Sequence, residues 1–163
     1  MKTSPHGGTP VNLVLRGIKN YLDINQITYT DLRYVGLQNL GKTGHEGVEV
    51  NIHWLVDNLA TNKVVWLNLG WYTRQGSFYQ RDGGHWVSLV GYGGKKLFVH
   101  DPGPWQSAEA KQRGYELQYH YPQQLIWWNE VLNPQTQFLS LVNLRPEVNS
   151  YALVEGAIAL GIE

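Results

Sequence analysis

The sequence predicts a single α+β domain in which a mostly antiparallel sheet packs against a few helices. A length of 163 residues is typical of one domain. Hydrophobic residues make up 42% of the chain and charged residues 16%, a balance typical of a chain that buries a core rather than a disordered one. Helical spacing of apolar residues comes early in the sequence, and short strand-like runs separated by glycine and proline follow it.

Two early segments carry apolar side chains at helical spacing. Thr9 and Pro10 are typical of an N-cap and a first helical residue, and the apolar positions that follow predict a helix over residues 10–22. A second helical stripe ends near Thr61 and Asn62. The apolar members of this stripe are Val48, Ile52, Leu55, Val56 and Leu59.

Most of the remaining chain is predicted to form strands. The segment 63–72 is apolar on both faces, which predicts a buried central strand. A turn at Gly93-Gly94 separates the strands 85–92 and 96–101. The other expected strands are 27–35, 116–122 and 139–144. Residues 125–132 and 150–160 are instead expected to form a short helix and a closing helix.

Composition excludes several classes of partner. The 13 basic residues balance the 13 acidic residues, so the sequence predicts no basic face for nucleic acid and no polybasic patch for a membrane surface. No apolar run approaches the roughly 20 residues of a spanning helix, so no membrane insertion is expected. The first ten residues lack the apolar core of a signal peptide. The sequence therefore does not indicate a cellular compartment.

The chain contains no cysteine but is rich in large aromatic residues. Without cysteine there is no disulfide, no thiolate metal site and no thiol nucleophile within these residues. Seven Trp, ten Tyr and three Phe are typical of a core and a cleft built from large amphipathic side chains. A stacking surface for sugars or peptides is the alternative interpretation of the same composition.

The most distinctive stretch is GGHWVSLVGYGGKKLFVHDPGP, residues 83–104. It places His85 at the start of one predicted strand and Asp101 at the end of the next, so both lie at one edge of a hairpin. An imidazole beside a carboxylate is the base and its orienting residue in a nucleophilic triad. A two-residue turn at Gly93-Gly94 would put the two side chains on opposite faces of the sheet. We therefore expect a three-residue loop or a bulge, with His85 and Asp101 within hydrogen-bonding range.

This stretch resembles the His/Asp segment of the bacteriocin-processing (double-glycine) branch of the papain-like cysteine peptidases. The resemblance implies a papain-like fold, with His85 as the general base and Asp101 as its orienting residue. Residues 8–22 resemble the helix that follows the nucleophile helix in such peptidases, and residues 64–72 resemble the central strand before the histidine. The similarity extends over about residues 8–104 of a single domain, residues 1–163.

The family's nucleophile is a cysteine at the start of an N-terminal helix, and this chain has none. The expectation is therefore a domain whose nucleophile helix is missing, inactive as it stands, from a parent that would hydrolyse a peptide or protein substrate. No cofactor and no metal are expected. The resemblance implies no compartment beyond the fact that such peptidases are often secreted.

Two other functions remain open. A degenerate domain would bind a peptide in the former cleft without cutting it, and aromatic side chains near the hairpin would line the groove. Those residues are Trp71, Tyr72, Trp86 and Trp105. A carbohydrate-binding module, based on the tryptophan content, is the third function.

Two physical expectations accompany the peptidase hypothesis. A missing helix would leave an apolar patch exposed on the strands 63–72 and 85–92, and such a patch favours self-association. A base at the edge of a cleft makes few packing contacts, so His85→Ala is expected to change stability by less than ~0.5 kcal/mol.

Overall fold

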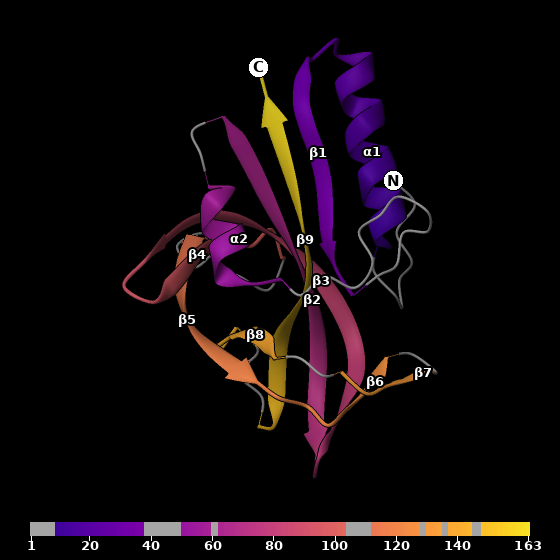
Figure 1. The fold of residues 1–163 in the computed structure, drawn as a ribbon, viewed down its shortest axis with the longest axis vertical. Coiled ribbons are helices and arrows are strands. Elements are labelled where there is room, and N and C mark those ends of the chain that lie inside the picture. The colour runs from indigo at the N-terminus through magenta and orange to yellow at the C-terminus, as the bar shows by residue number, and fades with distance from the viewer. Residues whose placement is uncertain are drawn as a thin grey trace.

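A computed structural model describes residues 9–37, 50–59, 62–103, 112–127, 130–134, 137–144 and 148–163. The protein is a mixed α+β fold, mostly antiparallel sheet with two short helices among the described residues (Figure 1). The helices are α1 (Val11–Ile24) and α2 (Ile52–Asp57). The strands are β1 (Tyr29–Gly36), β2 (Lys63–Gln75), β3 (Phe78–Gly93), β4 (Lys96–His100), β5 (Gln112–His120), β6 (Gln124–Trp127), β7 (Glu130–Leu132), β8 (Phe138–Leu141) and β9 (Ser150–Ile162).

Six of the strands close into a ring. β2 pairs with β3 on one edge and with β9 on the other, and the order then continues through β4, β5 and β8 back to β9. All of these pairings are antiparallel, and the last of them is short, with the single register pair Ser140↔Leu153. β1 adds to β9 beyond the ring, β6 runs parallel to the start of β3, and β7 pairs with β6. The result is a small barrel with strands added at its rim.

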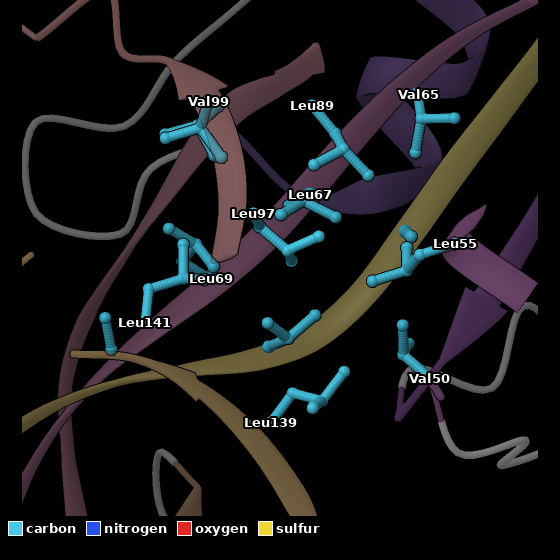
Figure 2. Packing of buried hydrophobic residues seen from close by; sticks show 14 of the residues in the cluster. Val50, Leu55, Val65, Leu67, Leu69, Leu89, Leu97, Val99, Leu139 and Leu141 are labelled. Carbon is cyan, nitrogen blue, oxygen red and sulfur yellow. The ribbon is translucent and has the colours of Figure 1, made fainter. Parts of the chain in front are cut away.

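The main hydrophobic core fills this barrel. Alternate residues of β2 point inward, so Val65, Leu67 and Leu69 are all fully buried. Residues from β3, β4, β8 and β9 pack against them, and α2 contributes Leu55 (Figure 2). Each aliphatic side chain that is fully buried in this way contributes about 1.5–3 kcal/mol. The barrel interior is therefore the main source of stability.

Helix α1 packs on the outer face of the sheet, alongside β1 (Figure 1). Val11, Tyr34 and Ile158 are the buried centre of this contact, and Trp66 and Trp86 pack at its margin. The helix predicted over residues 10–22 is confirmed, with a different start. Pro10 is the N-cap, and its carbonyl accepts from the backbone N–H of the first turn, so Thr9 does not cap the helix.

Two predicted helices are strands. Residues 150–160 belong to β9, which is covered by the barrel core on one face and by α1 on the other. A strand buried on both faces lacks polar alternation, and an apolar run of this kind cannot be distinguished from a buried helix by its periodicity. Residues 125–132 contain β6 and β7, which form a small antiparallel pair.

The other predicted strands are confirmed with shifted ends. The 63–72 strand is the first part of β2, which continues to Gln75, and the 85–92 strand lies in the second half of the longer β3. The expected apolar patch does not form on 63–72, because the large apolar side chains there are buried or half-buried. On 85–92 the exposed large apolar residues are Val90 and Tyr92.

Candidate functional site

The β3–β4 hairpin sets the geometry of the predicted His/Asp pair. Its turn has two residues, Gly94 and Lys95, with φ values of 58° and 63°, whereas Gly93 pairs with Lys96. Positive φ at both central residues is the geometry of a type I′ hairpin turn. The turn is therefore one residue later than the predicted Gly93-Gly94 turn.

A bulge at Val90 then determines which side chains share a face. Leu89 pairs with Val99 but Gly91 pairs with Phe98, so Val90 has no counterpart on β4. This pairing places His85 and Asp101 on the inward face, at the end of the barrel away from the hairpin turn. His85 Nε2 and Asp101 Oδ1 lie 2.6 Å apart. The predicted bulge and the predicted contact are both present.

The carboxylate of Asp101 is fixed in a buried position. Its side chain is 1% exposed, and the His85 side chain is 13% exposed. The backbone N–H of Gly103 also donates to Asp101 Oδ1, at 2.8 Å. Nearby, burial raises the pKa of Tyr115; Arg113 opposes this shift, and the Asp101 carboxylate adds to it. A carboxylate anchored in this way fixes the position of the imidazole that contacts it.

Trp71 covers the imidazole from β2. The two rings are stacked, with centroids 5.7 Å apart and planes inclined by 20°. Since Nε2 faces Asp101, a proton exchanged with a substrate or nucleophile would pass through Nδ1. Asp101 and Trp71 therefore hold the imidazole in one orientation, and the sequence contains no thiol.

Two of the other aromatic residues expected to line a groove, Tyr72 and Trp86, make their contacts elsewhere than with this pair. Tyr72 is fully buried, and its hydroxyl donates to Glu155 Oε1 at 2.8 Å. Trp86 packs among the residues beneath α1, where its Nε1 donates to the carbonyl of Thr9 at 3.0 Å. The burial and the contacts of these two residues do not fit a groove wall. Trp105 lies outside the described residues.

Sequence reasoning missed a buried ionic cluster. Glu155 accepts from Arg81 Nε at 2.6 Å and from Arg81 Nη2 at 2.9 Å, in addition to Tyr72. Burial raises the pKa of the Tyr72 hydroxyl, and the Glu155 carboxylate adds to this shift. The available signal was a single carboxylate, Glu155, in the otherwise apolar run 151–160.

Backbone irregularities and two glycines make room for this cluster. Glu155 lies in the bulge where the β2–β9 register shifts, and Asp82 lies in another bulge next to Arg81. Gly70 and Gly84 face each other across β2 and β3. A Cβ on either one would collide with the cluster, at the Glu155 side chain or at the Arg81 guanidinium.

A buried histidine, His120, lies away from the His85–Asp101 pair. Its Nδ1 is 3.1 Å from the Tyr79 hydroxyl, and Tyr151 contacts the ring edge-on with centroids 4.6 Å apart. Its Nε2 is buried and has no hydrogen-bond partner among the described residues. Burial lowers the pKa of His120, and Arg74 lowers it further. This environment is that of a neutral core histidine.

The described residues contain neither a metal-binding cluster nor a membrane-spanning helix. In the described part of the chain, no three acidic, histidine or cysteine residues are grouped so that they could hold a metal ion. No helix over those residues is both long and apolar enough to cross a membrane. No protein-family model, no curated protein and no solved structure matches this sequence.

Proposed function

We propose that this chain carries the base half of a papain-like cysteine-peptidase site, with His85 as the general base and Asp101 as its orienting residue. The observation that supports the proposal is the 2.6 Å contact between His85 Nε2 and a carboxylate that is itself anchored and almost fully buried. An oriented imidazole at the end of a barrel is the arrangement that nucleophilic catalysis needs.

The chemistry requires a cysteine from outside these 163 residues. His85 would take the thiol proton, and the thiolate would attack the peptide carbonyl carbon. The protonated His85 would then return the proton to the leaving amine, and water would hydrolyse the thioester. Asp101 would hold the ring and stabilise the imidazolium during both transfers. The chain alone supplies no nucleophile and is expected to be inactive.

The second candidate is a non-catalytic domain that binds a peptide at the same position. The absence of cysteine from the sequence favours it, and the stacked Trp71 offers an aromatic contact at the pair. A carbohydrate-binding module is less well supported, because Tyr72 is buried and Trp86 packs beneath α1, so these rings form no common platform with Trp71.

The test is to express the chain in frame with the coding sequence upstream of Met1 and to assay hydrolysis of a fluorogenic peptide. With an upstream cysteine, we expect activity that falls by about 10²–10⁴-fold in His85→Ala. His100→Ala is the matched control, because His100 is an exposed histidine on the same hairpin and should keep activity. Activity unchanged in His85→Ala contradicts the proposal, and an upstream region without cysteine favours the peptide-binding domain.

A further inference from the structure

We propose a second binding site, between α2 and the edge of β3, that takes the carboxyl-terminal end of an extended apolar peptide. A hollow of about 540 Å³ lies where the beginning of β2 and the end of β3 separate. Its walls are formed by Val56, Leu59, Lys63, Val64, Ser88, Leu89, Val90, Gly91 and Tyr92. Its volume is within the usual range for ligand sites, and most of its walls are apolar.

One wall of the hollow is an open strand edge. The β2–β3 ladder ends at Val65↔Leu89, whereas β3 continues to Gly93. Over this last part, the described residues provide pairing partners for β3 only from β4. The bulge at Val90 turns the strand at the point where the two strands part. An edge of this kind is where an added strand can pair.

The hairpin register shows which backbone groups face that edge. Gly93 and Lys96 flank a two-residue turn, so they form the hydrogen-bonded pair that closes it. The next pair, Tyr92↔Leu97, is then a non-hydrogen-bonded pair. The N–H and C=O of Tyr92 therefore point away from β4, toward the hollow. These two groups are the donor and acceptor that an added strand would use.

The side chains and the charge of the hollow define the ligand. Val90 and Tyr92 on β3 and Val56 on α2 are exposed large apolar residues, and burying them against apolar side chains is favourable. Lys63 is the single charged residue among the lining residues. Its Nζ donates to Asn58 Oδ1 at 3.1 Å, which positions the ammonium and leaves donors for a carboxylate. A peptide with apolar side chains and a free terminal carboxylate complements both features.

This site does not depend on the role proposed for His85. Tyr92 is seven residues along β3 from His85, which at about 3.3 Å per residue separates them by roughly 20 Å. Failure of one proposal therefore leaves the other unchanged.

The test is a titration of the isotope-labelled protein with the acetylated peptide Ser-Val-Thr-Val, followed by amide chemical shifts. We expect saturable shifts that are largest at Val90–Tyr92 and Lys63. The same peptide with an amidated carboxyl end should bind about tenfold more weakly, because it lacks the charge that pairs with Lys63. In a paired strand, alternate amides of the peptide face β3. N-methylation of the amides that face β3 should abolish binding, and N-methylation of the alternate amides, which face away, should not.

Variants assign the carboxylate preference. Lys63→Met should bind the acid and the amide equally, and Lys63→Arg should keep the preference. Lys96→Met is the control, since Lys96 is a lysine of the β3–β4 hairpin that lies outside the hollow, and this variant should also keep the preference. The arginine variant preserves the test if the methionine variant does not fold.

Four results would overturn the proposal. The first is the absence of saturable amide shifts at millimolar peptide. The second is equal binding of the free-acid and amidated peptides by the unmodified protein, and the third is a set of shifts centred on His85 and Trp71. The fourth is shifts at Val90–Tyr92 that grow with protein concentration in the absence of peptide, which would assign the edge to a second copy of this chain.

Discussion

Substitution of Glu155 tests whether the buried ionic cluster holds the barrel together. In Glu155→Ala, the guanidinium of Arg81 and the hydroxyl of Tyr72 lose the carboxylate that pairs with both. The Arg81 side chain is 5% exposed and the Glu155 side chain 1% exposed, so water cannot easily replace the lost partner. Removing one member of a buried pair typically costs about 3–5 kcal/mol, and we expect a loss of that size. Since a domain has roughly 5–15 kcal/mol in total, the variant should be close to unfolding.

A double-mutant cycle separates the pairing from the loss of packing. Arg81→Met leaves the buried Glu155 carboxylate without its cationic partner, with the Tyr72 hydroxyl still donating to it, and should also be strongly destabilising. Arg81→Met combined with Glu155→Leu removes both charges, so it should cost less than the sum of the two single changes by at least ~2 kcal/mol. The measurement is urea unfolding followed by tryptophan fluorescence, with the midpoint and slope compared between variants.

An exposed ion pair of equal length is the matched control. Arg33 Nε and Asp31 Oδ2 also lie 2.6 Å apart, but the side chains are 45% and 25% exposed. Exposed pairs are worth about 0–1 kcal/mol, so Asp31→Ala should have little effect. Two results would show that burial does not make the Glu155 cluster important for stability. One is a loss of stability in Glu155→Ala no larger than in Asp31→Ala, and the other is an additive double-mutant cycle.

Three further predictions concern titratable groups. His85→Ala should cost about 1–3 kcal/mol in urea unfolding, because it removes one hydrogen-bond partner of the buried Asp101 carboxylate and leaves the Gly103 N–H in place. This loss exceeds the ~0.5 kcal/mol expected of a base at a cleft edge, and a measured loss that small would show that the carboxylate stays satisfied without His85. Burial and Arg74 lower the pKa of His120 in the folded protein. The free energy of unfolding should therefore decrease as the pH falls below the unfolded-state pKa of about 6.5, by at most ~1.4 kcal/mol per pH unit. Thermal melts of His120→Gln should lack this decrease. Burial and Glu155 raise the pKa of Tyr72, so the free energy of unfolding should decrease as the pH rises above the unfolded-state pKa of about 10. Tyr72→Phe should reduce this decrease. An unchanged stability profile at alkaline pH would contradict the raised pKa of Tyr72.

The His/Asp contact could be predicted from the sequence because it depends on local rules. Glycines marked the turn, and strand alternation showed that a simple two-residue turn at Gly93-Gly94 would separate His85 from Asp101. The contact thus required an irregularity of some kind. The position of the bulge at Val90 and the turn at Gly94-Lys95 were not predictable, because several irregularities restore the same face.

What escaped prediction depends on distant partners. Arg81 and Glu155 are 74 positions apart, and nothing near either residue indicates the other. The run 150–160 became a strand because β2 and β1 pair with it and α1 covers it, which its own periodicity does not reveal. Trp86 and Tyr72 are aromatic residues of the predicted groove. In the structure Trp86 packs beneath α1 on the opposite face of the sheet, and Tyr72 belongs to the buried cluster at Glu155.

The position of β9 in the chain has a consequence for folding during synthesis. β9 pairs with β1, β2 and β8, and all three precede it in the sequence. Its residues leave the ribosome after those of every partner, so the barrel cannot close while residues 150–162 are still being made. Until then the partner strands have unpaired edges, which are the surfaces that promote aggregation. A stall or premature stop before residue 150 should therefore yield an insoluble product rather than a smaller folded domain.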